Sequence, residues 1–211
     1  RFPAPQDRRA GADYRVRAAV KYVCADRPLL LALIAVTTVG FASDPSITLT
    51  PSVADQLGGG AGLVGALSAV FGIGAAVGMV VLALMRGRMA SAQVSSIGLA
   101  GLTAGCGMLA VAAGPAAAMA GFALAGLGFG WAMTGLSTVV QERAPAELRG
   151  RIMALWLVGF LGSRPIAAAL LGGTADGVSV QAAFAVAAVL TLAVTVWCRP
   201  SNLVGPLPAH V

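Results

Sequence analysis

The chain has 211 residues, of which 58% are hydrophobic and only 10% are charged, whereas about a quarter of the residues in a soluble domain are charged. A mean hydropathy of +0.86 excludes intrinsic disorder, which requires high charge and little apolar surface. The net charge of +6 does not indicate nucleic-acid binding, because no basic polar face with base-reading groups is present. The composition predicts an all-α membrane protein that crosses the bilayer several times.

The chain starts with a polar stretch at Arg1 rather than with methionine, which favours a piece of a longer protein. No signal peptide is expected, because the first apolar run begins only near Leu29. Within residues 14–26, Val16, Val20 and Val23 alternate with basic side chains. This spacing predicts an amphipathic helix on the inner membrane surface, and a solvated linker helix fits the pattern equally well.

Six apolar segments follow, each long enough for one crossing at about 20 residues per crossing. The predicted segments lie at about 29–50, 61–85, 92–113, 115–140, 151–173 and 178–198. Residues 1–27 then form a cytoplasmic linker, 28–198 form six transmembrane helices, and 199–211 form a cytoplasmic tail. We expect residues 200–211 to be disordered, because the tail contains three prolines.

Loop charges predict the orientation of the bundle in the membrane. Thirteen of the 14 basic residues fall on one side of the predicted crossings, and an excess of Lys and Arg marks the cytoplasmic side. The intervening loops contain Asp55 and Asp176 and no basic residue. Both termini are therefore expected in the cytoplasm, with the lipid bilayer of the plasma (inner) membrane as the surrounding partner.

The crossings contain glycines at a spacing that lets helix backbones approach closely. These pairs are Gly74 with Gly78, Gly101 with Gly105, and Gly126 with Gly130. A weak internal match relates residues 66–74 in the second crossing to residues 154–162 in the fifth. Since the two segments run in opposite directions, the match favours a 3+3 inverted repeat.

Two charges fall inside the predicted membrane. Arg164 lies roughly 18 to 20 Å from the cytoplasmic start of the fifth crossing, and Asp44 lies about 22 Å from the same side in the first. An intramembrane charge favours a functional site, so we expect the two to pair, or to bind an anionic group or a proton together. In the alternative, Asp44 lies at the outer interface and Arg164 bonds helix carbonyls.

Three stretches resemble a known transporter family. They are Val-Val-Gln-Glu-Arg-Ala-Pro-Ala-Glu-Leu-Arg-Gly-Arg-Ile-Met-Ala-Leu at 139–155, Gly-Ser-Arg-Pro-Ile at 162–166 with Leu-Gly-Gly-Thr-Ala-Asp at 171–176, and Tyr-Val-Cys-Ala-Asp-Arg-Pro-Leu at 22–29. Together they are similar to the C-terminal six-helix half of a major facilitator superfamily transporter, in its siderophore and drug exporter branch. Residues 85–89 depart from the family, because its gating motif at this place contains an acid that is missing here.

The resemblance implies half of a twelve-helix fold that moves a small amphipathic substrate by alternating access, in exchange for protons. It implies a missing N-terminal six-helix half as partner; the alternative is a truncated, non-transporting module. The helices corresponding to the first and fourth crossings face the family's cavity. The candidate pathway residues on these crossings and in the fifth are Thr37, Thr38, Asp44, Trp131, Thr134, Ser137 and Arg164. Each polar residue among them also fits a plain helix contact.

The loop before the fifth crossing contains a second set of candidates, for a cytoplasmic gating network. They are Glu142, Arg143, Glu147, Arg149 and Arg151. Plain interfacial anchoring, with residues 145–147 starting a helix, fits them at least as well.

Other classes of function lack the residues that they need. A serine protease in the membrane requires a histidine base, and the only histidine is His210 in the tail. Neither paired acids nor a metal-ligand spacing occurs in the crossings, so we expect no enzyme activity, no cofactor and no metal. A channel needs a ring of like groups, and no such pattern repeats. The three cysteines are expected to be small apolar fillers.

Overall fold

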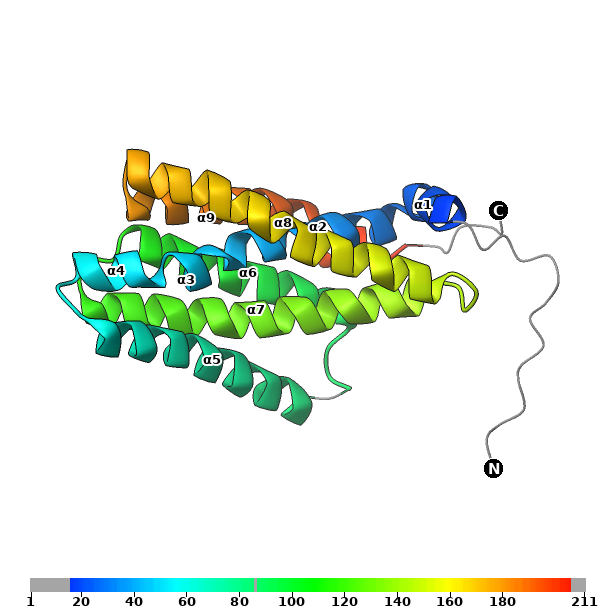
Figure 1. The fold of residues 1–211 in the computed structure, drawn as a ribbon. Coiled ribbons are helices and arrows are strands. Elements are labelled where there is room, and N and C mark those ends of the chain that lie inside the picture. The colour runs from blue at the N-terminus through cyan, green and yellow to red at the C-terminus, as the bar shows by residue number, and fades with distance from the viewer. Residues whose placement is uncertain (1–15, 86, 206–211) are drawn as a thin grey trace, which may run out of the picture.

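The computed structural model describes residues 16–85 and 87–205, which form a bundle of helices (Figure 1). Six segments are long and apolar enough to cross a membrane, as predicted. Five of them are single helices: α5 (Ala61–Leu84), α6 (Ser91–Ala110), α7 (Pro115–Arg143), α8 (Arg149–Gly177) and α9 (Val180–Trp197). Their ends differ from the predicted ends by four residues or fewer, since apolar length determines a crossing directly.

The first crossing is a broken helix that spans Arg27–Thr48, close to the predicted 29–50. It consists of α2 (Arg27–Ser43) and α3 (Pro45–Thr48), and the short α4 (Thr50–Gln56) follows it. Pro45 starts α3 and Pro51 lies in the first turn of α4. Proline has no backbone N–H and suits the first turn of a helix, so each proline begins a new short segment. The chain therefore stays helical beyond the crossing, in α4, after the expected end at residue 50.

Both ends of the described chain pack against the bundle. α1 (Val16–Ala25) buries Ala19 and Val23 and leaves Val16 and Val20 exposed. The expected disorder of the tail is wrong for its first residues, because α10 (Pro200–Leu203) is a short helix. Its Leu203 is buried among hydrophobic residues, and this apolar contact outweighs the breaking effect of Pro200. Residues 206–211 and Tyr14 lie outside the described residues.

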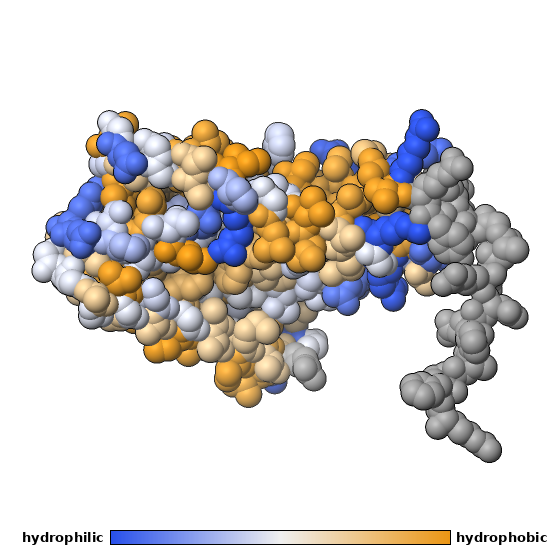
Figure 2. All heavy atoms as spheres, viewed as in Figure 1, coloured by the Kyte–Doolittle hydropathy of each residue, from blue (hydrophilic) through white to orange (hydrophobic). Residues whose placement is uncertain are grey.

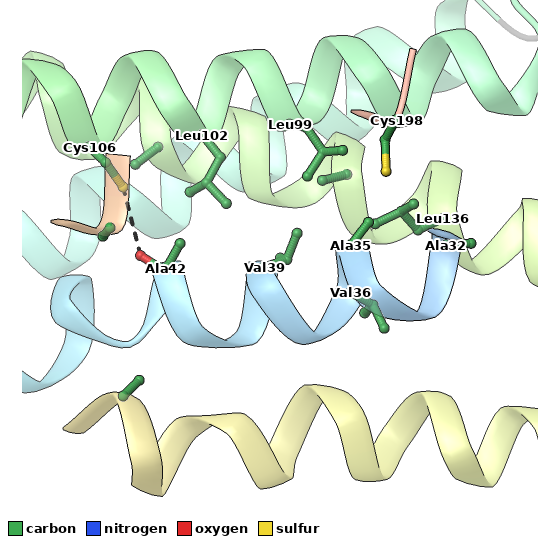
Figure 3. Packing of buried hydrophobic residues seen from close by; sticks show 14 of the residues in the cluster. Ala32, Ala35, Val36, Val39, Ala42, Leu99, Leu102, Cys106, Leu136 and Cys198 are labelled. Atoms are coloured by element: carbon green, nitrogen blue, oxygen red, sulfur yellow. Dashed lines mark hydrogen bonds between the residues drawn. The ribbon is translucent and has the colours of Figure 1, made fainter. Parts of the chain in front are cut away.

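The core of the bundle surrounds α2. Figure 3 shows Ala32, Ala35, Val39 and Ala42 of α2 directed toward Leu99, Leu102 and Cys106 of α6 and Leu136 of α7. Small residues also bring α6 against α7: a side chain at Gly98 would overlap the backbone of Ala132, and one at Gly105 would overlap Ala125. Close backbone approach holds helices together where hydrophobic association is weak, as in lipid. Of the six glycines singled out in the sequence, five meet the backbone of a neighbouring helix, and Gly78 meets the side chains of Trp131 and Leu127.

The three cysteines differ in their surroundings. Cys106 and Cys198 are buried, and each sulfur lies 3.7 Å from a carbonyl of α2, on Ala42 and Leu31 respectively. These two are the small fillers that the sequence predicts. Cys24 is exposed on α1, so the prediction is wrong for this residue, which lies on the outer side of an amphipathic helix.

Two helices, α5 and α8, are each covered by other helices over only a small part of their surface. Only 17% of α5 and 17% of α8 is buried within their most apolar stretches, compared with 56% for the first crossing and 50% for both α6 and α7. α5 and α8 are the middle members of the two successive triplets of crossings. Their exposed side chains are largely apolar, and Figure 2 shows a broad apolar surface between hydrophilic ends.

Candidate functional site

An ion pair joins the first and fifth crossings inside the bundle. The Nε atom of Arg164 lies 3.7 Å from Oδ1 of Asp44. One helical turn earlier on each helix, Gly40 of α2 meets the carbonyl of Phe160 of α8, where a larger side chain would overlap it. Since α2 and α8 run in the same direction, this close crossing brings the residues four positions later, Asp44 and Arg164, next to each other.

The ion pair lies near the middle of α8. Arg164 is 15 residues from the start of this helix, which corresponds to about 22 Å of a length of about 43 Å. Asp44 is buried at the junction of α2 and α3, and its side chain is only 6% exposed. The contact brings Asp44 to the level of Arg164, four residues before the end of the first crossing at Thr48.

The arginine of this pair has unused hydrogen-bonding capacity. Oδ2 of Asp44 accepts a hydrogen bond of 3.0 Å from Thr48. The 3.7 Å contact exceeds the usual N–H···O distance of about 2.7–3.2 Å, and Arg164 donates no hydrogen bond within residues 16–85 and 87–205. Guanidinium carries five N–H donors, and 29% of the Arg164 side chain is exposed. N–H groups of Arg164 are therefore open to a further hydrogen-bond acceptor.

Thr37 lies two turns before Asp44 on the face of α2 that meets α8, next to Gly159, and Thr38 lies beside it on the helix. They line a cavity of about 890 Å³ between α2, α8 and α9, together with Phe41, Gly162 and Trp197. The hydroxyl of each threonine donates to its own helix, to the carbonyls of Leu33 and Ile34. The cavity is consequently apolar, although two threonines face it.

The three candidates on α7 make helix contacts. Trp131 is buried, and its Nε1 donates a 2.7 Å hydrogen bond to the carbonyl of Gly78 on α5. Thr134 donates to the carbonyl of Gly130, and Ser137 donates to that of Thr134. Thr134 also lines a cavity of about 360 Å³ between α5, α6 and α7. These side chains do not converge on the Asp44–Arg164 pair.

The loop candidates contact several different elements. Glu142 accepts a 2.7 Å hydrogen bond from Ser91 at the start of α6, and Arg149 donates to the carbonyl of Ala144. Glu147 is exposed and Arg151 is half-buried. Arg143 turns away from the loop and contacts the start of α2, so the structure does not bring all five residues to one point.

A second ion pair, between Arg143 and Asp26, was not predicted from the sequence. Nε of Arg143 lies 2.9 Å from Oδ2 of Asp26, and Nη2 lies 2.9 Å from Oδ1. Asp26 also caps α2 by accepting from the backbone N–H of Leu29. Nη1 of Arg143 donates to the carbonyl of Gly205. One arginine thus joins the end of α7, the start of α2 and the chain after α10.

Tyr22 completes this contact at the end of α1. Its hydroxyl donates a 3.3 Å hydrogen bond to the carbonyl of Arg143. Burial raises the pKa of Tyr22, and the negative charge of Asp26 adds to this effect. The sequence did contain one signal, because Asp26 directly precedes Arg27 and Pro28 and so fits the N-cap of a helix.

Metal binding has no support in the described residues, where no group of three or more His, Cys, Asp or Glu side chains could hold an ion. The fold and the ion pairs define a polytopic helical membrane protein with paired charges between its helices. The sequence profile of the Major Facilitator Superfamily matches residues 29–208. The chain belongs to this superfamily, as the resemblance implied.

Solved structures show the same fold. The E. coli fucose:proton symporter FucP superimposes with a TM-score of 0.74 at 16% identity, covering 94% of this chain and 49% of the symporter. The peptide transporter POT in complex with alafosfalin gives 0.73 at 18% identity, covering 88% of this chain and 42% of that transporter. The chain thus spans somewhat less than half of these structures, and it forms a six-helix half of their fold. No curated protein matches the chain in sequence.

Proposed function

We propose that this chain is the C-terminal half of a secondary transporter that moves a small amphipathic molecule by alternating access. Membership of the Major Facilitator Superfamily and the likeness to two transporter structures support membrane transport. The chain covers 42% to 49% of those structures, which supports a missing six-helix half as partner. The open sides of α5 and α8 offer that half an apolar surface.

The observation that carries the proposal is the ion pair between Asp44 and Arg164. Charges inside a membrane are expensive and usually belong to substrate or ion pathways. The pair joins the later part of the first crossing to the middle of the fifth, and its arginine has unused donors. In this proposal a proton or a substrate group changes the Asp44–Arg164 contact as the crossings rearrange.

We further propose that transport is coupled to protons and directed outward. One structural neighbour is a fucose:proton symporter, which supports protons as the coupling ion, although a symporter moves its substrate in the same direction as the proton. The outward direction rests on the resemblance of the 139–155 loop to exporters. Asp44 is the candidate proton carrier, because among the described acids it is the one paired with Arg164 inside the crossings.

The proposed orientation has both termini in the cytoplasm of a plasma (inner) membrane. It is supported by the location of thirteen basic residues on one side of the crossings. Arg143, Tyr22 and the chain at Gly205 meet at this end, so the ends of the described chain lie on the same side.

The test uses the full-length protein in proteoliposomes with the Asp44→Asn variant. We expect proton-driven transport to be lost while substrate exchange without a proton gradient continues, because the amide cannot carry a proton. Asp55→Asn and Asp176→Asn, which change exposed acids at the far end, are the matched controls. Unchanged proton-driven transport in Asp44→Asn would move the coupling site to the other half. Absence of transport by the wild-type protein would favour the alternative, a non-transporting membrane module.

A further inference from the structure

Four aromatic side chains form a continuous series across three helices, which we call the aromatic ladder. Trp156 and Phe160 of α8 stack with ring centroids 5.9 Å apart. Phe160 meets Phe129 of α7 at 6.2 Å, and Phe129 meets Phe71 of α5 at 5.8 Å. These distances fall within the range of favourable aromatic pairs. The ladder therefore links α8 to α5 through α7.

The backbone explains why the rings line up. Trp156, Phe160 and Arg164 are four residues apart in sequence, so they lie on one face of α8, one turn above another. On the other side, Gly126 of α7 lets α5 approach so closely that a side chain there would overlap the carbonyl of Phe71. This approach brings Phe71 to Phe129.

A cation ends the ladder. The guanidinium carbon of Arg164 lies 5.8 Å from the centroid of Phe160, within the range of a cation–π contact. The Nε atom of Arg164 lies 3.7 Å from Oδ1 of Asp44. Within residues 16–85 and 87–205 the five N–H groups of Arg164 donate no hydrogen bond.

The ladder contains a second donor without a partner. Nε1 of Trp156 is buried and has no acceptor among the described residues, and indole nitrogen is a donor only. Trp156 lies eight residues before Arg164 on α8, which corresponds to about 12 Å along the helix. A buried polar group without a partner is unfavourable, and since Nε1 of Trp156 is fully covered, Arg164, with 29% of its side chain exposed, is the donor that a ligand reaches directly.

We propose that the aromatic ladder and Arg164 bind the substrate as a planar aromatic acid. The ring system of the substrate lies against Phe160 and its neighbours, and its carboxylate or other anionic group accepts from Arg164. The four rings are only half-buried, and they lie on α5 and α8, the two least buried crossings, and on α7 between them. This inference rests on the proposed transport function and adds the class of substrate.

Charge and shape both matter to this assignment. An aliphatic acid would accept from Arg164 but would gain no ring contacts, while a neutral aromatic compound would gain the rings and leave the unused N–H groups of Arg164 without an acceptor. A planar aromatic acid satisfies both the rings and these N–H groups. In contrast, a ladder that only packs against the missing half would favour neither property.

The test measures equilibrium binding to the full-length protein in nanodiscs, without any gradient. The probes are 2-naphthoate, its saturated analogue decahydronaphthalene-2-carboxylate, and the uncharged 2-naphthalenemethanol. We expect 2-naphthoate to bind about tenfold more tightly than either analogue, which corresponds to one good aromatic or cation–π contact. Equal binding of the aromatic and saturated acids, or no binding of 2-naphthoate, would overturn the proposal.

Two matched variants locate the preference. Phe160→Leu removes the ring that contacts Trp156, Phe129 and Arg164. The preference should then disappear, so that 2-naphthoate and the saturated acid bind with about equal affinity. Phe41→Leu makes the same change in the cavity between α2, α8 and α9 and should leave the preference intact. Loss in both variants, or in neither, contradicts the assignment. A negative result here leaves proton-driven transport by Asp44 untouched, because that is measured with a gradient and without these probes.

Discussion

Arg143 and Asp26, 117 positions apart in sequence, form a two-point ion pair at the end of the bundle where α1, α2 and α7 meet. The carboxylate of Asp26 has no exposed surface, and the side chain of Arg143 is only 10% exposed. Two parallel hydrogen bonds make an arginine–carboxylate contact strong and directional. The pair therefore fixes the start of α2 to the end of α7.

Removal of one partner leaves a buried charge without its counter-charge. We expect Asp26→Asn or Arg143→Gln to lower the free energy of unfolding by about 3–5 kcal/mol, measured as thermal unfolding in detergent. The double variant should be less harmful than the sum of the two single variants. Glu147→Gln, which alters an exposed acid of the nearby loop, serves as the control. A change in Asp26→Asn no larger than in Glu147→Gln would contradict this role.

The close crossing of α2 and α8 at Gly40 predicts a strong effect of side-chain size. Gly40→Leu forces a side chain into the carbonyl of Phe160 and should separate Asp44 from Arg164. Overpacking costs about 1–3 kcal/mol, which thermal unfolding would detect, and transport should fall as well. Gly107→Leu on α6 is the control, because no atom lies within 4 Å of the added carbon there. Equal stability of the two variants would show that this crossing is not tight.

Replacement of two threonines by valine should have opposite effects on transport. Thr38 lines the apolar cavity and donates only to its own helix, so Thr38→Val should leave proton-driven transport at the wild-type rate. Thr48 donates to Oδ2 of Asp44, so Thr48→Val should alter the pH dependence of transport or slow it. The measurement is the initial rate in proteoliposomes at several pH values. A larger effect of Thr38→Val would restore the sequence-based assignment of this residue to the pathway.

The exposed natural cysteine, Cys24, offers a labelling test of the orientation of the chain in the membrane. Cys24 is exposed on α1, while Cys106 and Cys198 are buried. A membrane-impermeant maleimide should label Cys24 in inside-out vesicles and leave right-side-out vesicles unlabelled, with Cys24→Ser as the control. Labelling of right-side-out vesicles would place the start of the chain outside the cytoplasm.

The crossings and the depth of their charges could be predicted, because a helix that crosses a membrane runs through its thickness and the position of a residue along the helix gives its depth. Each helical residue adds about 1.5 Å, and this alone brought Asp44 and Arg164 to similar levels. The direction in which each side chain points around its helix could not be predicted in this way. Trp131 therefore bonds to α5 and stands away from the ion pair, although its depth is plausible.

The broken end of the first crossing and the Arg143–Asp26 pair were missed for different reasons. Pro45 and Pro51 start new helical segments, but hydropathy treats them only as weak interruptions of an apolar run. Asp26 fits a helix cap by local pattern, whereas its contact with Arg143 depends on how distant helices pack, and no local pattern encodes that arrangement.

The central claim is that Asp44 and Arg164 work as one unit in transport. Its most direct test is a double-mutant cycle with Asp44→Asn, Arg164→Gln and both together, in which the rate of substrate exchange by the full-length protein is measured without a proton gradient, because Asp44→Asn alone is expected to abolish proton-driven transport. Residues in contact show coupling of about 0.5–3 kcal/mol, so we predict that the double variant is little worse than either single one. Independent, multiplicative losses, or single variants that transport at the wild-type rate, would contradict the account.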